Sequence, residues 1–105
     1  MDEAIKHFED LLRVRPDDPK AHNNLGNALA EQGNTADAIS HWREAIRLKP
    51  DYSEAHCNLG IALTEQGKLD DAIQYFEKAL SLAEAQSRSA MAADVRKKLE
   101  AIRKR

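Results

Sequence analysis

The chain of 105 residues has few of the residues that mark disulfide scaffolds, membrane proteins and secreted proteins. Its single cysteine, Cys57, cannot form an internal disulfide, so the fold does not depend on an oxidising compartment. No apolar run approaches the ~18 residues of a membrane-spanning helix, and the charged start MDEAIKHFED is unlike a signal peptide. We therefore expect a soluble protein that is cytoplasmic rather than secreted.

The sequence also lacks a large net charge and the motifs of common enzymes. The net charge is only -2 and aromatic residues make up 5% of the chain, which favours neither a polyanionic partner nor insertion into a membrane. The sequence has no nucleophile elbow, no glycine-rich phosphate loop and no HExxH motif. We therefore expect no enzyme, no catalytic residue and no cofactor. What remains is a composition rich in Ala, Leu, Glu, Lys and Arg, which is typical of helical proteins.

Two stretches of the chain are nearly identical and lie 34 residues apart. AHNNLGNALAEQG begins at Ala21 and AHCNLGIALTEQG begins at Ala55, and 15 of the 34 positions in the full period are identical. One group of identities has the i, i+3, i+4, i+7 spacing of a helix face and comprises His22, Leu25, Gly26 and Leu29. The repeat therefore predicts a helical array.

Each period is expected to form a helix, a tight turn and a second helix. Gly33 and Gly67 follow the first apolar face of each period, where a helix commonly ends with a residue at positive φ. Asp18 before Pro19 has the pattern of an N-cap followed by proline in the first helical turn.

The two periods differ in how their second helix ends. Pro50 stops the helix of the first period, because proline cannot continue it. The second period has Glu84 at this position, which leaves open whether its helix ends near Ala85 or continues. Ser89 is the candidate N-cap of a last helix, whose predicted apolar face is Met91, Val95, Leu99 and Ile102.

A period of 34 residues with this pattern resembles the tetratricopeptide repeat (TPR). The matching positions are Leu25, Gly26, Leu29, Ala38, Trp42, Ala45 and Pro50, and then Leu59, Gly60, Leu63, Ala72, Phe76 and Ala79. The resemblance implies an all-α, right-handed solenoid of antiparallel helix pairs, with about two and a half repeats and a C-terminal capping helix. The repeats are also similar to those of the O-linked N-acetylglucosamine transferase superhelix.

The resemblance divides the chain into four segments. Residues 1–16 match the second helix of a repeat one period earlier, residues 17–52 and 53–86 are the two repeats, and residues 87–105 are the capping helix. Because the chain begins in the middle of a repeat, we interpret it as the C-terminal portion of a longer repeat protein, with Met1 added by cloning.

The candidate partner-binding site lies on the first helix of each repeat. Stacked helix pairs curve, and the first helix of each pair lines the inner side. The predicted exposed stripe of the first repeat is Lys20, Asn23, Asn24, Asn27 and Glu31. Its counterpart in the second repeat is Glu54, Cys57, Asn58, Ile61 and Glu65.

Asn24 and Asn58 occupy the same position in the two stripes. Asparagine is unfavourable in the middle of a helix, because its amide competes for nearby backbone groups. The same amide offers a donor and an acceptor together, which suits the backbone of an extended peptide. The arrangement is similar to the asparagine ladder of the O-linked N-acetylglucosamine transferase. The alternative is that both residues are inherited from a repeat consensus and only tolerate solvent.

A carboxylate clamp, another peptide-binding arrangement in this family, fits the stripes less well. Lys20 and Asn24 suit it, but Glu54 lies where the second repeat requires a base. A metal site is not expected either. His56 and Cys57 are adjacent, so their side chains diverge by about 100° around the helix.

The remaining histidines have structural interpretations. His22 and His56 are expected between packed helices, and His7 and His41 on the outer face. The basic segment 96–105 contains no aromatic residue to stack on bases, so we expect a solvated cap and no nucleic-acid site.

The leading hypothesis is a non-catalytic protein–protein interaction scaffold that binds a protein or an extended peptide along the predicted stripes. One alternative is a substrate-presenting or regulatory segment of a larger enzyme, such as a glycosyltransferase. Another is self-association, because a first helix without a partner would expose Ile5, Phe8 and Leu12.

Overall fold

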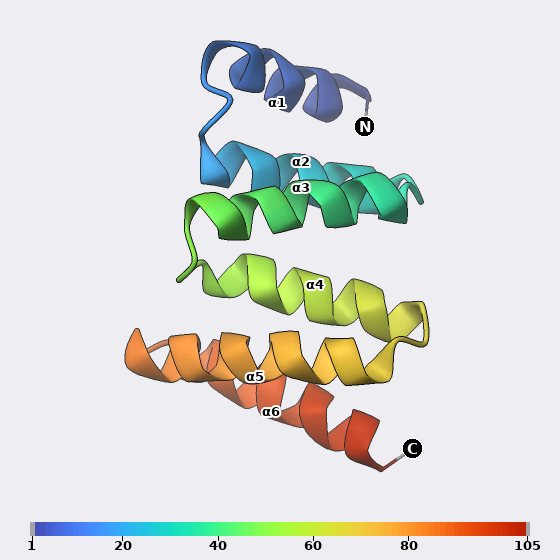
Figure 1. Cartoon of the computed structure of the whole chain (residues 1–105), viewed down its shortest axis with the longest axis vertical. Coiled ribbons are helices and arrows are strands. Elements are labelled where there is room, and N and C mark those ends of the chain that lie inside the picture. Colours follow the sequence, from blue (N-terminus) through green and yellow to red (C-terminus); the bar gives the residue numbers. More distant parts are fainter. Residues whose placement is uncertain (1, 105) are drawn as a thin grey trace. The chain divides into compact units, whose positions relative to one another are not determined.

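The structure is a computed structural model that describes residues 2–104. Met1, which we interpret as added by cloning, lies outside the described residues. This part of the chain is helical and contains no strand, which confirms the predicted all-α class. The helices (Figure 1) are α1 (Asp2–Val14), α2 (Pro19–Glu31), α3 (Thr35–Leu48), α4 (Ser53–Glu65), α5 (Leu69–Ala85) and α6 (Ser89–Arg103). Among the described residues, no helix combines the length and the apolar character needed to cross a membrane.

The helices belong to two compact units, Met1–Pro50 and Asp51–Arg105. In the first unit α2 packs against α3, and α1 packs against α2. In the second unit α4 packs against α5, and α6 packs against α5 (Figure 1). Each unit therefore contains one helix hairpin and one additional helix that covers part of it.

The start of α2 is fixed by a side-chain cap. The Asp18 carboxylate accepts hydrogen bonds from the backbone N–H groups of Lys20 at 3.0 Å and Ala21 at 3.3 Å, and Pro19 is the first helical residue. This confirms the predicted N-cap. Tyr52 takes the corresponding place before α4 and forms no side-chain cap.

The tight turns of both hairpins depend on glycine. Gly33 has φ +84° and Gly67 has φ +77°, which confirms the predicted positive-φ positions. After α2, the N–H of Asn34 donates to the carbonyl oxygen of Leu29 at 2.9 Å, the bond that closes a Schellman motif. The turn satisfies carbonyls that would otherwise lack a partner and reverses the chain within a few residues.

The end of α5 uses the same geometry without glycine. Ser87 has φ +58°, and the N–H of Arg88 donates to the carbonyl oxygen of Ala83 at 2.8 Å. The helix therefore ends at Ala85, which answers the question left open by the missing proline. The predicted cap is wrong by one residue, because Ser89 is the first residue of α6 and Arg88 is the N-cap.

Small residues face large rings in the core of each hairpin. Trp42 of α3 is 4% exposed and packs on Gly26, while Phe76 of α5 is 1% exposed and packs on Gly60. An added Cβ at either glycine would lie 2.6 Å from the ring. The glycines therefore let the paired helices approach closely.

The packing of α1 changes the predicted open edge. Ile5, Phe8 and Leu12 are half-buried, because α1 packs on α2. The exposed large apolar residues of α1 are instead Leu11, at 40%, and Val14, at 81%. The prediction that the first three form an open apolar edge is therefore wrong.

Candidate functional site

The exposed face of α2 is a narrow arc. Lys20 and Glu31 are exposed, and Asn24 and Asn27 are half-buried. Successive residues of an α-helix are about 100° apart, so these four positions fall within about 60° of the helix circumference. Packing covers most of the remaining surface of this helix, and a partner can reach α2 along this arc.

The two asparagines of this arc differ in what they bind. The Trp42 indole Nε1–H donates to Asn27 Oδ1 at 3.1 Å and to the backbone carbonyl of Asn23 at 3.2 Å. The Asn27 side chain therefore helps to position the ring of Trp42. By contrast, the amide of Asn24 forms no hydrogen bond with another residue in the range 2–104. Asn24 is the more available donor and acceptor.

The exposed face of α4 occupies the equivalent arc in the second unit. Ile61 and Glu65 are exposed, and Glu54 and Asn58 are half-buried. Arg88 Nη1 forms an ion pair with Glu54 Oε1 at 2.8 Å. The hydrogen bond from Arg88 lowers the pKa of the Glu54 carboxyl, with burial acting in the opposite direction. This arc therefore contains a carboxylate that is ion-paired (Glu54), an amide (Asn58) and an exposed apolar side chain (Ile61).

Two residues of the predicted stripes are buried. Asn23 is 5% exposed and Cys57 is 8% exposed, so the prediction that they are exposed is wrong. Both lie about 40° around the helix beyond the edge of the arc. At that angle the surface of the helix is already covered by packing. Burial also raises the pKa of the Cys57 thiol, which keeps it protonated and chemically unreactive.

His22 and His41 form a hydrogen-bonded pair inside the first unit. Their Nδ1 atoms are 3.1 Å apart, and their ring centroids are 5.3 Å apart. His22 Nε2 is 2.9 Å from the carbonyl oxygen of Pro16, which can only accept, so Nε2 carries the proton. With that proton on Nε2, the Nδ1 of His22 can accept from the Nδ1–H of His41. The expectation that His41 lies on the outer face is wrong, because it is half-buried against His22.

The pair does not assemble a larger ligand set. Within the described part of the chain, no group of three His, Cys, Asp or Glu side chains is placed to hold a metal ion. His41 instead affects how stability depends on pH. Burial, and secondly the charge of His22, lowers the pKa of His41, while Asp37, Glu9 and Glu44 oppose this shift.

Acidification is expected to destabilise the protein through His41. Because the folded state holds this proton less tightly than the unfolded chain, the contribution is complete above about pH 6.5 and is lost as the pH falls below that value. Thermal unfolding at about pH 8 and about pH 6 measures the effect. His41→Gln should show a smaller drop in Tm than wild type. His7→Gln, at the exposed position one period earlier, serves as control, and equal drops in all three proteins would contradict this role of His41.

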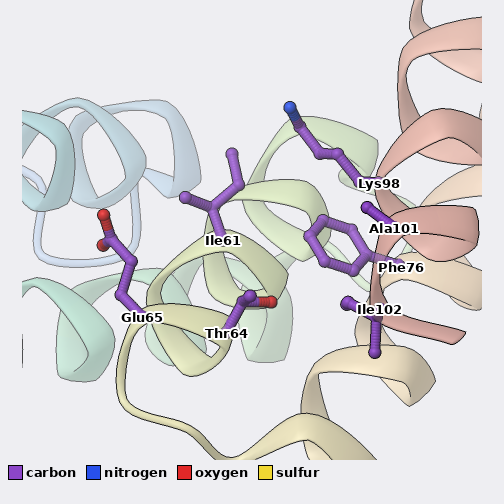
Figure 2. A pocket seen from close by; sticks show the side chains of 7 residues that line it. All are labelled: Ile61, Thr64, Glu65, Phe76, Lys98, Ala101 and Ile102. Carbon is purple, nitrogen blue, oxygen red and sulfur yellow. The ribbon is translucent and has the colours of Figure 1, made fainter. Parts of the chain in front are cut away.

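An apolar hollow lies beside the arc of α4. It has a volume of about 220 Å³ and is lined by Ile61, Thr64 and Glu65 of α4, Phe76 of α5, and Lys98, Ala101 and Ile102 of α6 (Figure 2). In Figure 2 the Phe76 ring lies between Ile61 and the side chains of α6. Sequence reasoning assigned Ile61 and Glu65 to the site and missed the residues from α5 and α6.

A difference between the two repeats was the available signal for this hollow. The first repeat has Asn27 and Trp42, joined by a hydrogen bond, where the second has Ile61 and Phe76. Both polar partners are thus replaced by apolar residues in the second repeat. The position next to the aromatic ring changes from polar to apolar.

The basic residues of α6 are largely paired with carboxylates. Arg96 pairs with Glu84 of α5, and Arg103 Nη2 lies 2.9 Å from Glu77 Oε2 of α5. Within α6, Lys98 Nζ is 3.4 Å from Asp94 Oδ2. The pairs of Arg96 and Arg103 join α6 to α5 on their exposed sides, which agrees with a solvated cap.

The chain matches known proteins by family and by fold. A family model described as tetratricopeptide repeat matches residues 17–85. A sequence comparison with curated proteins finds no match. The solved structure of PcrH in complex with the chaperone binding region of PopD is 25% identical, with a TM-score of 0.91 over 96% of this chain and 77% of that one.

Two further solved structures are similar. The Yersinia enterocolitica chaperone SycD, in complex with a peptide of the translocator YopD, is 21% identical, with a TM-score of 0.90 over 97% of this chain and 79% of that one. MamA is 26% identical, with a TM-score of 0.76 over 80% of this chain, which spans about half (49%) of the MamA chain. These matches confirm the predicted class, an all-α solenoid of helix pairs, and the chain belongs to the tetratricopeptide repeat family.

Proposed function

We propose that this protein is a non-catalytic interaction module that holds an extended segment of a partner protein along the arcs of α2 and α4. The observation that carries this proposal is the repeated asparagine. Asn24 and Asn58 occupy the same position in each arc, both half-buried, and the Asn24 amide has no hydrogen-bond partner among residues 2–104. A half-buried amide on a packed helix is held in place, so the receptor loses little entropy on binding.

An asparagine side chain can bond to a peptide backbone in both directions, through its N–H₂ group and its carbonyl oxygen. Such bonds read the backbone and not the side chains, so they tolerate many partner sequences. Each contributes about 0.5–1.5 kcal/mol, whereas micromolar affinity requires about 8 kcal/mol. Apolar contacts must therefore supply most of the affinity, and the asparagines set the path of the bound segment.

The similar structures support this assignment by analogy of fold. PcrH is in complex with a region of PopD, and SycD with a peptide of YopD, so both have a segment of another protein as partner. The resemblance to the repeats of the O-linked N-acetylglucosamine transferase rests on the sequence of the two repeats. The asparagine ladder is what that resemblance implies. The proposed partner is likewise a protein or an extended peptide.

Selection from a random peptide library tests the proposal. Asn24→Ala/Asn58→Ala should weaken binding of the selected peptides about 5- to 150-fold, the expected value of losing two hydrogen bonds. Gln74→Ala removes an exposed amide from α5, outside the arcs, and should leave affinity unchanged. The assignment to these arcs would be wrong if the double variant bound as tightly as wild type.

Self-association is a second candidate. It is favoured by the exposed Leu11 and Val14 of α1, which offer apolar area to another copy. Sedimentation at several concentrations tests it, since a monomer at every concentration would contradict it.

A further inference from the structure

The second repeat has an apolar pair, Ile61 and Phe76, at a hollow where the first repeat has the polar pair of Asn27 and Trp42 at the matching positions. In the first repeat the Trp42 N–H occupies the Asn27 carbonyl oxygen, so that both polar groups are used within the hairpin. Phe76 has no such donor, and the residue beside it is Ile61, which is 38% exposed. Ile61 is the one exposed large apolar side chain in the described part of the second unit. Ile61 lines the hollow together with Phe76 and Ile102, so its exposed side chain is part of a concave apolar surface, which is the kind of surface that receives a ligand group.

The size and lining of the hollow suit one apolar side chain. Its volume is about 220 Å³, and an apolar cavity of about 150 Å³ is already large enough to hold benzene. Phe76 is 1% exposed and Ile102 is 6% exposed, so both are held in place by packing. They form an apolar surface next to Ile61 (Figure 2). A leucine- or isoleucine-sized group could enter without displacing these residues.

Side chains of opposite charge lie on the two sides of the hollow and can orient a bound segment. Glu65 lies on the α4 side and Lys98 on the α6 side of Ile61 and Phe76 (Figure 2). Glu65 has no ion pair with any residue in the range 2–104, so its carboxylate is available to a cation. Among the described residues, Lys98 pairs with Asp94 of its own helix at 3.4 Å, which is a weak pair in solvent.

We infer that this hollow receives a branched aliphatic side chain of the partner segment, flanked by a basic residue on the Glu65 side and an acidic residue on the Lys98 side. The inference rests on the proposed function and specifies its partner. The aliphatic side chain provides the apolar burial that the asparagines cannot supply. The flanking charges determine in which direction the segment runs.

The experiment uses the full chain and peptides selected from a random library. Selected peptides should share an aliphatic residue between a basic and an acidic residue. Changing that residue to alanine in a synthetic peptide should weaken binding about 10- to 50-fold, the effect of burying one such side chain. Ile61→Asn, which introduces the residue of the first repeat, should have a similar effect while circular dichroism shows the fold unchanged.

Charge reversal provides the matched test. Glu65→Lys should weaken binding about two- to fivefold, and replacing the basic residue of the peptide by glutamate should restore it. If peptides bind but Ile61→Asn and Glu65→Lys have no effect, this inference is wrong and the proposed function stands. If no peptide binds the wild-type protein, the proposed function fails and the inference with it.

Discussion

Trp42→Ala is expected to lower the free energy of unfolding by about 3–5 kcal/mol, the usual cost of removing a large buried ring. Trp42 is 4% exposed and packs on Gly26, so its loss leaves a cavity between α2 and α3. It also removes the Nε1–H that bonds to Asn27 Oδ1 at 3.1 Å. Urea unfolding followed by far-ultraviolet circular dichroism measures the change, since the variant contains no tryptophan for fluorescence.

Trp42→Phe is the matched control, because phenylalanine is the residue at this position in the second repeat. It keeps most of the ring contact and loses the donor, so a smaller cost of about 1–2 kcal/mol is expected. A value for Trp42→Ala within about 1 kcal/mol of wild type would show that the ring does not hold the hairpin together.

Gly60→Val is expected to cost about 3 kcal/mol, the upper end of the usual range for overpacking. A Cβ at this position would lie 2.6 Å from Cε1 of Phe76, and the ring is 1% exposed, so it has little room to move. The cost arises although valine is a better helix former than glycine by a few tenths of a kcal/mol. Helix propensity alone predicts the opposite sign.

A double-mutant cycle with Phe76→Leu isolates this contact. Leucine occupies less space than the ring, so Gly60→Val should cost at least 1 kcal/mol less in the Phe76→Leu background than in wild type. Equal costs in the two backgrounds would contradict the account, since the penalty would then have nothing to do with the ring.

Features of the fold that depend on local backbone rules could be predicted from the sequence. The cap at Asp18 and the positive-φ glycines at Gly33 and Gly67 follow from a few neighbouring residues. That Gly26 packs on Trp42 and Gly60 on Phe76 was seen only in the structure, because it depends on how two helices pack. The left-handed turn at Ser87 was not predictable in this way, because serine seldom adopts φ near the observed +58°.

The candidate site was predicted only in part, because its limits depend on packing. Helical periodicity identified the exposed arcs, but it could not show that Asn23 and Cys57 lie just beyond their edges. The hydrogen bond between His22 and His41 joins two helices at a distance of 3.1 Å, and no spacing within one helix indicates it. The hollow beside Ile61 requires α6, which lies outside the repeat pattern of residues 17–85.

The central claim is that the arcs of α2 and α4 hold a partner segment. Chemical-shift mapping tests it most directly, by titrating the isotope-labelled protein with a peptide selected from a library. The account predicts that the side-chain amide signals of Asn24 and Asn58 and the methyl signals of Ile61 shift most. Shifts gathered instead at Gln74, Lys78 and Ser81, on the exposed side of α5, with both asparagine amides unmoved, would contradict it.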